Sequence, residues 1–387
     1  MKKRKSKRKK VKRSLIVILL CVLSAIAGFY IQRKKNFVNE VVKVEYKTVN
    51  TEVVNKASIV MVGDALMHMA VNSSYKTSNG YNFTNMFKYI KPIVSEYDLA
   101  YYNQETVLGG TSLGLSGYPQ FNSPQEVGDA FIDAGFNLVS LATNHSMDNY
   151  YKTNGKSIKN STEYWKNHED KAFAAGMYNS GEDRDKEIIK EINGIKYAFL
   201  SYTEQTNGIS VPSGKSYLVN VYSNEKAKKD IEKYKEKVDV IIVAMHWGEE
   251  YTHTPTSSEK GKAKYLASLG VNLIIGCHPH VVQPMTYIGD TLVVYSLGNF
   301  VSNQDGVDRL TGLMASANIV KRTYHGKTTI KVDDPTAEFI YTKKSEKHMV
   351  YPYSKLTNSI LSNYKTYYDK HKKIVTSMSD KIKVKEI

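Results

Sequence analysis

The sequence predicts an α/β protein with a largely parallel, buried β-sheet. From Ser58 onward, short apolar runs rich in β-branched residues alternate with amphipathic segments of helical spacing. Parallel strands joined by helices are covered on both faces, which is why they read as continuous apolar runs. The apolar fraction of 41% and the charged fraction of 24% are ordinary for a globular protein and exclude a disordered chain.

Most of the excess positive charge lies at the N-terminus. The formal net charge is +16, but residues 2–13 hold ten Lys or Arg and no acid, and Arg33, Lys34 and Lys35 add three more. Subtracting 13 from 16 leaves +3 for residues 36–387. A nucleic-acid-binding domain concentrates basic residues on its folded surface, so we expect no nucleic-acid partner. Cys21 and Cys277 are too few for a disulfide framework.

Residues 14–31 (SLIVILLCVLSAIAGFYI) form an uncharged apolar segment after the basic residues 1–13. As a helix rising about 1.5 Å per residue it would span roughly 27 Å, enough for a bilayer core. The charge excess before it predicts a single-pass anchor with residues 1–13 in the cytoplasm and the main domain outside the cell. The small residues at 24–28 leave a cleaved signal peptide open as the alternative. Residues 32–56 are polar and Val-rich, and suit a stalk or an edge strand.

The predicted elements define a main domain over residues 57–302 and a C-terminal extension over 303–387. Strands are predicted at 58–62, 99–102, 138–141, 197–202, 240–245, 273–276 and 292–296, and helices at 83–97, 124–134, 224–237 and 257–269. After about residue 305 the pattern changes to β-like runs at 313–320, 328–332 and 337–341, followed by a helix at 353–368 and a Lys-rich tail. We expect residues 345–387, at the end of this extension, to be a docking or polymer-contacting appendage rather than part of the core.

Side chains that bind metals follow the ends of six predicted strands. In an α/β sheet, ligands bind beyond the carboxyl ends of the strands. Each residue alone has an ordinary structural explanation as a turn or cap, but together they predict one site. They are Asp64 and His68; Asn103 and Glu105; Asn144, His145 and Asp148; His246 and Trp247; His278 and His280; and Asn299.

The ligand types in this set indicate the kind of metal. Oxygen and imidazole ligands without thiolate suit Mn, Fe, Zn or Mg. The number of ligands predicts two divalent ions bridged by a carboxylate, with open positions for water and substrate. Trp247 could stack on a substrate or pack in the core, and Cys277 is expected to fill space at a strand end.

The order of these motifs resembles the CapA capsule-synthesis family. The resemblance covers about residues 57–302 and is carried by Gly63-Asp64, Asn103…Glu105, Asn144-His145-Ser146…Asp148, His246-Trp247-Gly248…Glu250-Tyr251, Gly276…His278-Pro279-His280-Val281 and Tyr295-Ser296-Leu297-Gly298-Asn299-Phe300. That family includes proteins required for making or anchoring poly-γ-glutamate at the bacterial surface. Its domains are similar to calcineurin-type metallophosphoesterases, which implies an αββα sandwich with a dinuclear metal site.

The resemblance also implies roles for individual residues. Asp64 and His280 would hold the first metal, Glu105 would bridge both, and the second metal would be held by Asn144, His246 and His278. His145 would sit at the scissile group as general acid or charge stabiliser, oriented by Asp148. Substrate binding is assigned to His68, Asn103, Trp247 and Asn299.

The sequence departs from the family pattern at three positions. Glu105 stands where phosphoesterases usually have Asp, Thr143 where relatives often have a second Asn, and His68 where many carry Arg. Together these features predict a membrane-anchored, extracellular metal-dependent hydrolase or transferase in surface-polymer assembly. Its expected partners are an acidic polymer and membrane-bound polymer synthase subunits. The alternative is a non-enzymatic scaffold that keeps the metal ligands for stability.

Overall fold

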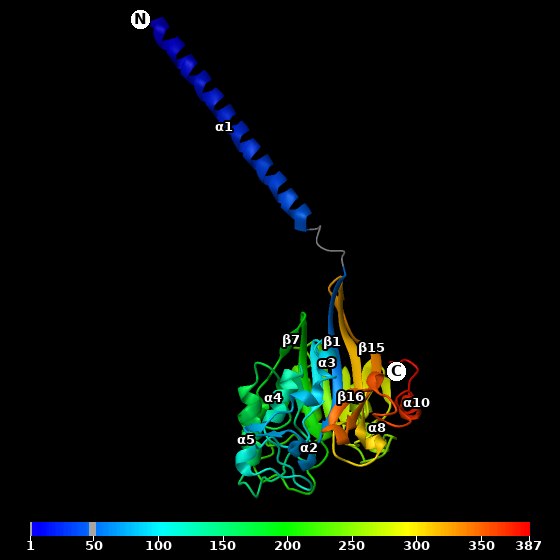
Figure 1. The fold of residues 1–387 in the computed structure, drawn as a ribbon. Coiled ribbons are helices and arrows are strands. Elements are labelled where there is room, and N and C mark those ends of the chain that lie inside the picture. The colour runs from blue at the N-terminus through cyan, green and yellow to red at the C-terminus, as the bar shows by residue number, and fades with distance from the viewer. Residues whose placement is uncertain (1, 46–51) are drawn as a thin grey trace. The chain divides into compact units, whose positions relative to one another are not determined.

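The structure is a computed structural model that describes residues 2–45 and 52–387. The chain forms two compact units, Met1–Val53 with Thr323–Lys327, and Val54–Arg322 with Thr328–Ile387. The first unit contains α1 (Lys2–Glu45), which is a single helix (Figure 1). Within it, the 21-residue segment Ile16–Asn36 is a candidate membrane span by length and composition, with a mean hydropathy of 2.0 over an 18-residue window. A signal sequence near an N-terminus would have the same properties, so both alternatives for this segment remain.

The expected stalk at 32–56 is helical up to Glu45, and a strand begins at Val53. Residues 46–51, which the stalk prediction also covers, lie outside the described residues.

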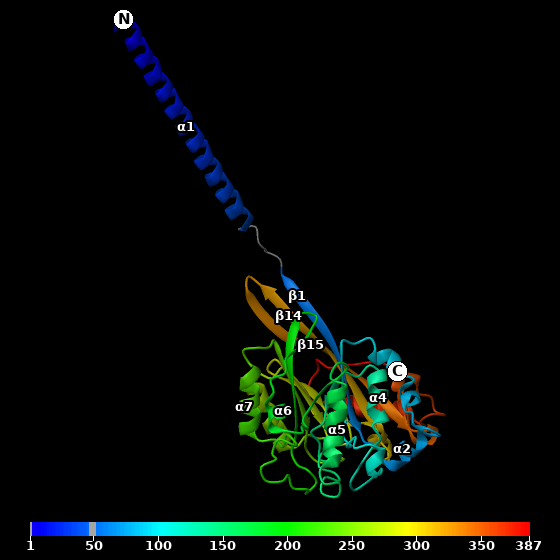
Figure 2. The same ribbon diagram turned by 90° about the vertical axis from the view of Figure 1, so that its left-hand side faces the viewer.

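Two mixed sheets form the centre of the second unit. The nine-stranded sheet has the order β16-β15-β14-β1-β4-β5-β6, with β13 beside β1 and β17 beside β15. Its strands are β1 (Val53–Ala65), β4 (Leu99–Asn103), β5 (Leu138–Ser140), β6 (Phe173–Ala175), β13 (Asn299–Val301), β14 (Thr311–Tyr324), β15 (Lys327–Lys343), β16 (Met349–Pro352) and β17 (Lys383–Val384). In Figures 1 and 2, β1, β14 and β15 run side by side along the length of this sheet.

The six-stranded sheet has the order β11-β12-β10-β9-β8-β7. Its strands are β7 (Lys190–Ile192), β8 (Ile195–Thr203), β9 (Val240–His246), β10 (Leu273–Cys277), β11 (Met285–Ile288) and β12 (Thr291–Val294). β2 (Lys76–Thr77) and β3 (Gly80–Tyr81) form a separate small hairpin. The neighbours β8, β9, β10 and β12 are parallel, as are β1, β4, β5 and β6, so each set of carboxyl ends meets at one edge.

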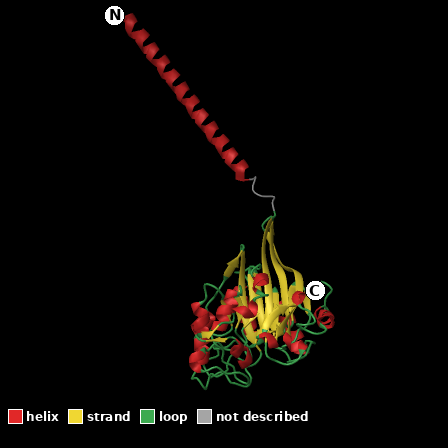
Figure 3. Ribbon diagram, viewed as in Figure 1, coloured by secondary structure: helices red, strands yellow, loops and turns green. Residues whose placement is uncertain are grey.

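The helices of the second unit are α2 (Met69–Ser74), α3 (Lys91–Val94), α4 (Glu126–Asp133), α5 (Lys156–Asn167), α6 (Gly181–Asp185), α7 (Asn224–Tyr234), α8 (Ser257–Ser268), α9 (Val307–Leu310) and α10 (Tyr364–Val375). The first four pack against the outer face of the nine-stranded sheet, and α7 and α8 pack against the outer face of the second sheet (Figure 3). By contrast, Leu310 of α9 and Tyr368 and Val375 of α10 join the core between the sheets. Short 3₁₀ helices are η1 (Thr84–Phe87), η2 (Thr111–Leu113), η3 (Lys344–Glu346) and η4 (Tyr353–Lys355). Ser223 and Thr256 cap α7 and α8 by accepting a backbone N–H, and Glu259 completes a capping box at α8.

The alternation of side chains along each strand produces the four layers. Ile59 and Tyr101 point to the core between the sheets, where they join Phe199 and Ile275 from the second sheet. The intervening residues of the first sheet pack against α4 and α5, and those of the second sheet pack against α7 and α8. The predicted α/β class and αββα sandwich are therefore confirmed.

Two predicted helices differ from the observed ones. The segment 83–97 forms η1 and α3 as separate short pieces, and Pro92 lies in the first turn of α3. The predicted helix at 353–368 forms η4 and then α10, which begins only at Tyr364.

The C-terminal extension belongs to the same compact unit as the main domain. β14, β15 and β16 continue the sheet that contains β1, and the side chains of Tyr353, Tyr368 and Val375 are buried in the core between the sheets. The expectation of a separate appendage is therefore wrong, because Lys-rich surface positions in α10 alternate with apolar residues that face inward.

Candidate metal centre

The carboxyl ends of the central strands bring the predicted residues to one place. In the register of the first sheet, Asp64 at the end of β1 lies opposite Asn103 of β4 and Asn299 of β13. In the second sheet, His246 at the end of β9 pairs with Cys277 of β10. The backbone N–H of Asp64 donates to the carbonyl of Gly298 at 3.0 Å. A Cβ at Gly63 would lie 1.8 Å from that carbonyl oxygen, so this close approach requires glycine.

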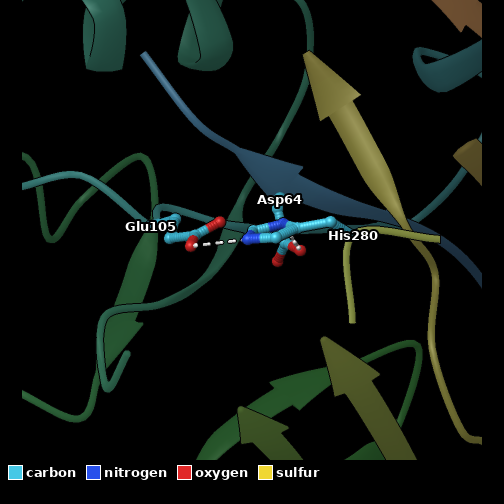
Figure 4. Close-up of side chains that lie close together, drawn as sticks. All are labelled: Asp64, Glu105 and His280. Carbon is cyan, nitrogen blue, oxygen red and sulfur yellow. Dashed lines mark ion pairs between the residues drawn. The ribbon is translucent and has the colours of Figure 1, made fainter. Parts of the chain in front are cut away.

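Asp64, Glu105 and His280 form a buried group whose ligand atoms all lie within 4.8 Å of one another. Nδ1 of His280 is 3.2 Å from Oδ2 of Asp64, and Nε2 of the same ring is 3.6 Å from Oε1 of Glu105. Figure 4 shows the imidazole linked to both carboxylates. Ligand atoms that are each about 2.1 Å from a metal ion lie roughly 3–4 Å apart, so this spacing fits a shared ion.

A second group of predicted ligands also approaches Glu105. Nε2 of His246 is 3.9 Å from Oε1 of Glu105, 2.8 Å from Oδ1 of Asn144 and 3.2 Å from Nδ1 of His278. Oε1 of Glu105 therefore lies within 4 Å of an imidazole from each group, which is compatible with a bridging carboxylate. The structure brings all six predicted metal ligands together.

The bonding of Glu105 is the strongest indication that the site accepts a cation. Its side chain is fully buried, and among the described residues neither carboxylate oxygen has a hydrogen-bond partner. A buried, unpaired carboxylate costs several kcal/mol unless a cation or a proton compensates it. Burial raises the pKa of Glu105 well above its usual range, because a carboxylate removed from water is disfavoured relative to the neutral acid. The residues present therefore fit a divalent metal.

The histidines of the centre differ in their protonation. Burial, with a smaller contribution from neighbouring imidazoles, lowers the pKa of His246 well below its ordinary value. The same two causes lower the pKa of His278 to about 4. Burial alone would lower the pKa of His280 too, but the carboxylates of Glu105 and Asp64 outweigh it and raise that pKa to about 9. Neutral imidazoles offer a lone pair to a metal, and an ion beside His280 would replace its proton.

The loop that carries two of the ligands is strained. His278 and His280 have φ angles of 98° and 58°, in a region that non-glycine residues rarely adopt. Tyr251, whose backbone N–H donates to the carbonyl of Pro279 at 2.7 Å, also has a positive φ of 66°. Strained residues persist where surrounding contacts hold them, and they cluster at functional sites.

His145 and Asp148 form the predicted pair beside the metal ligands. Nδ1 of His145 is 2.7 Å from Oδ2 of Asp148, which also accepts the backbone N–H of Phe121 at 2.6 Å. The Phe121 ring contacts the His145 imidazole edge-on, with centroids 4.7 Å apart. Burial raises the pKa of Asp148, whereas its bond with His145 acts in the opposite direction. The pair holds the imidazole in one orientation.

A cavity of about 440 Å³ opens onto this edge of the sheets. Its wall includes His280, Asn144 and His145 from the centre, together with His68. His68 is fixed at Nδ1, which lies 3.1 Å from the carbonyl oxygen of Leu66, and burial lowers its pKa to about 4. Two larger cavities, of about 560 and 640 Å³, are lined by none of the predicted site residues. His68 therefore lies in the wall of the cavity that reaches the predicted ligands, and its role as a substrate contact stays a prediction.

Three residues assigned to substrate binding occupy other places. Nδ2 of Asn103 donates to Oδ1 of Asp64 at 2.8 Å, and Oδ1 of Asn299 is 2.9 Å from Nδ1 of His280, so these buried amides contact two predicted metal ligands. Trp247 is 0% exposed, and its indole N–H donates to the carbonyl of Tyr295. Its burial between β9, β10 and α8 supports the packing alternative.

The structure also places residues at the cavity that the sequence prediction missed. Asn207, in the loop after β8, has its amide nitrogen 3.5 Å from Nε2 of His145. Tyr251 and Glu250 line the cavity beside His280, and the Glu250-Tyr251 pair in the motif that begins at His246 was the available signal. Asn207 had no such signal, since it lies in a loop 62 residues from His145.

Comparison with known proteins gives the same result as the motifs. Residues 58–304 match the model of the bacterial capsule synthesis protein family PGA_cap. The capsule biosynthesis protein CapA of Bacillus anthracis is 26% identical over 309 residues, covering 78% of this chain and 71% of that protein. The PGA biosynthesis protein CapA of Bacillus subtilis (strain 168) is 26% identical over 272 residues, covering 68% and 67%.

Solved structures with a similar fold are more distant. The calcineurin-like phosphoesterase YfkN of Bacillus subtilis has 16% identity and a TM-score of 0.45, covering 83% of this chain and 99% of that chain. A putative 5'-nucleotidase from Staphylococcus aureus has 15% identity and a TM-score of 0.44, and the match covers 81% of this chain and 58% of that chain. From the match over residues 58–304, the chain belongs to the bacterial capsule synthesis protein family PGA_cap.

Proposed function

We propose that this chain is a membrane-anchored, extracellular metal-dependent hydrolase or transferase that acts in making or anchoring a surface polymer of the poly-γ-glutamate type. Family membership supports the capsule pathway. The observation that carries the chemical part is the buried carboxylate of Glu105, which has no hydrogen-bond partner among the described residues and lies within 4 Å of the His246 and His280 imidazoles. A protein that kept the fold without a metal would gain stability from an apolar residue there.

Two divalent ions, of Mn, Fe, Zn or Mg, are the proposed cofactors. Asp64 and His280 would hold one ion, and the other would be held by Asn144, His246 and His278, with Glu105 between them. When bound, such ions would supply Lewis-acid activation of water and of a phosphoester or amide group. Asn103 and Asn299 orient Asp64 and His280, so their part is to fix the ligands.

His145 is the proposed acid–base residue. Because Asp148 is an acceptor, Nδ1 of His145 carries the proton of their 2.7 Å bond, and Nε2 remains available on the cavity side. When Nε2 also carries a proton, the imidazolium held by Asp148 can donate that proton to a leaving group or stabilise developing negative charge, and the ring is then left neutral. The nearby amide of Asn207 can contact the same substrate group.

The cellular setting forms part of the proposal. The apolar segment within α1 would be the single-pass anchor, and the charge excess of residues 2–13 would keep the N-terminus in the cytoplasm. The domain would then meet the acidic polymer and the membrane-bound synthase subunits outside the cell. Protease added to intact cells should degrade the domain and spare residues 1–13. Protection of the domain would contradict this topology.

A metal-stabilised scaffold is the second candidate, and the depth of the site favours it. The side chains of Asp64 and Glu105 are 0% exposed, so an ion held there would stabilise the junction of the two sheets whether or not it met a substrate.

One experiment separates the two candidates. The full-length chain is purified in detergent, and its metal content and its turnover of a generic phosphoester are measured beside surface-polymer yield in cells that carry His145→Ala. The enzyme proposal predicts that the purified wild-type chain contains metal and turns over the phosphoester, and that cells carrying His145→Ala lose the surface polymer. Bound metal with normal polymer yield in His145→Ala would support the scaffold instead.

A further inference from the structure

The short helix α9 connects the candidate metal centre with the C-terminal helix α10. On one side, the backbone carbonyl of Arg309 accepts a hydrogen bond from Nδ2 of Asn299 at 2.8 Å. On the other side, Asp308 contacts two residues of α10. Two neighbouring residues of α9 therefore make the connection: Arg309 contacts the candidate metal centre, and Asp308 contacts α10.

The carbonyl of Arg309 determines which way the Asn299 amide points. A carbonyl can only accept, so the amide nitrogen must face it and Oδ1 must face His280. Oδ1 is an acceptor and lies 2.9 Å from Nδ1 of His280, which therefore carries the proton. Nε2 of His280, on the Glu105 side, is left with the lone pair that a metal would take. The same amide nitrogen also donates to Oε1 of Gln304 at 2.9 Å, and Oδ2 of Asp64 lies 3.2 Å from Nδ1 of His280. The position of α9 thus acts together with these two side chains in orienting a proposed ligand.

Asp308 holds α9 against two other elements. Its carboxylate is 3.1 Å from Nε2 of His371 and within 2.7 Å of Nζ of Lys370, both on α10. Nε2 of His253, in the loop that follows β9, is 3.7 Å away. The His253 ring is itself fixed by a 2.8 Å contact from Nδ1 to the carbonyl oxygen of Val282.

Of the two contacts between Asp308 and α10, the one with His371 is partly buried. The His371 side chain is 0% exposed and packs against Phe339 with ring centroids 5.7 Å apart, whereas Asp308 is 36% exposed and Lys370 is 44% exposed. Lys372 pairs with Glu386 near the C-terminus, and those side chains are 40% and 76% exposed. Exposed pairs of that kind contribute little, whereas a carboxylate bonded to a buried imidazole keeps a defined geometry.

We propose that Asp308 is a positioning residue for the metal centre. It holds α9 so that the Arg309 carbonyl fixes Asn299, and Asn299 fixes His280. The C-terminal helix, through His371 and Lys370, is then part of the support of the metal site. This inference rests on the proposed function, because it requires that the centre bind a divalent metal.

The test is a titration of the metal-stripped, full-length chain in detergent with Mn²⁺ in Asp308→Asn and Lys370→Met. The matched control is Lys372→Met, which makes the same change two positions along α10 in a pair that does not touch α9. Thermal unfolding in a chelator measures the stability of each apo variant separately. Contacts that orient metal ligands typically change affinity by about 10–100-fold, and we expect Asp308→Asn to raise the Kd by roughly 10-fold. Lys370→Met should have a smaller effect in the same direction, and Lys372→Met should change the Kd less than twofold.

A double-mutant cycle distinguishes positioning from general stabilisation. If Asp308 acts through Asn299, the combined variant Asp308→Asn/Asn299→Ala should bind Mn²⁺ no more weakly than Asn299→Ala alone. Fully additive losses would overturn the proposed route. A lower melting temperature with an unchanged Kd in both Asp308→Asn and Lys370→Met would overturn the inference while leaving the proposed function standing. Absence of Mn²⁺ binding by the wild-type chain would overturn both. If Asp308→Asn does not fold, the test is the Mn²⁺ Kd of Lys370→Met compared with that of Lys372→Met. Equal Kd values for these two variants would then overturn the inference.

Discussion

Oε1 of Glu105 lies 3.6 Å from Nε2 of His280, too far for a hydrogen bond and close enough for both atoms to contact one metal ion. The same oxygen lies 3.9 Å from Nε2 of His246. Among the described residues this carboxylate has no hydrogen-bond donor, and the arrangement fits a shared cation.

Replacing Glu105 by Gln should change stability in opposite directions with and without metal. In a chelator, Glu105→Gln should be at least as stable as the wild type, because the change removes a buried, unpaired carboxylate. At a metal concentration of 100 Kd the wild type should gain about 2.7 kcal/mol, and the variant should gain much less. Thermal unfolding with and without Mn²⁺ measures both effects.

Asp133→Asn is the control for the previous change, since Asp133 forms an exposed pair with Lys91. It should respond to metal as the wild type does. Equal metal stabilisation of the wild type and Glu105→Gln would show that Glu105 is not a ligand.

His145→Ala should spare the metal content and reduce turnover. The imidazole contacts Asp148 and Asn207 and is assigned to the substrate group, so its loss removes acid–base assistance without removing a ligand. A positioned acid–base group usually contributes about 10²–10⁴-fold in rate. Elemental analysis and initial rates of the purified variant check both parts. Loss of bound metal together with turnover would mean that His145 is itself a ligand.

Arg184→Met should strongly destabilise the domain. Arg184 binds Asp230 through both carboxylate oxygens, and Asp230, whose side chain is 8% exposed, also accepts from the Tyr202 hydroxyl at 2.8 Å. Removing the guanidinium leaves a buried carboxylate without its cation, which costs about 3–5 kcal/mol. Denaturant unfolding measures the change in the free energy of unfolding.

Lys91→Met is the matched change in an exposed pair, in which both side chains are 49% exposed. It should cost no more than about 1 kcal/mol. Similar losses in the two variants would contradict the assignment of Arg184 and Asp230 as a structural pair.

Acid should destabilise the domain through His348 before the carboxylates titrate. His348 is 4% exposed, its Nε2 lies 2.8 Å from Oδ1 of Asn303, and burial lowers its pKa from 6.5 to about 4. Between these two values the unfolded chain binds a proton that the folded chain does not, so stability falls as the pH is lowered from about 6.5 to about 4. The upper bound of this contribution is about 3 kcal/mol, since each pKa unit corresponds to about 1.4 kcal/mol.

Unfolding free energies measured from pH 7 to pH 4 in the wild type and in His348→Gln test this effect. The variant should show a flatter profile over that range. Ser74→Ala removes the Oγ contact to the same ring but keeps the imidazole, and it should retain the wild-type slope. Parallel profiles for the wild type and His348→Gln would contradict the prediction.

Local sequence patterns were sufficient for the central strands and for the placement of predicted ligands at their ends, but not for short strands such as β6, β13 and β16. The run predicted at 240–245 forms β9, and the ligand His246 is its last residue, because a parallel strand ends where polar side chains meet at the sheet edge. Asp64 and Glu105 come together for the same reason. The roles assigned to these residues stay predictions, since the geometry shows proximity and burial rather than chemistry.

The failures have tertiary causes. Trp247 follows a strand end like the other site residues, but its side chain points to the helix side of the sheet, and local sequence does not reveal this direction. The C-terminal residues 353–387 looked like a Lys-rich appendage because their apolar residues are spaced widely over η4, α10 and β17. Their burial becomes visible only when β14, β15 and β16 extend the first sheet beneath them.

Metal content of the purified full-length chain tests the central claim most directly. The chain is isolated without added chelator, and bound transition metals and magnesium are measured by elemental analysis in the wild type, Glu105→Gln, His280→Ala and the control Asp133→Asn. The proposed centre predicts close to two equivalents in the wild type and the control, and loss of at least one equivalent in Glu105→Gln and His280→Ala. A wild-type chain that holds no metal even after incubation with Mn²⁺, Fe²⁺, Zn²⁺ and Mg²⁺, or a Glu105→Gln variant with full occupancy, would contradict it.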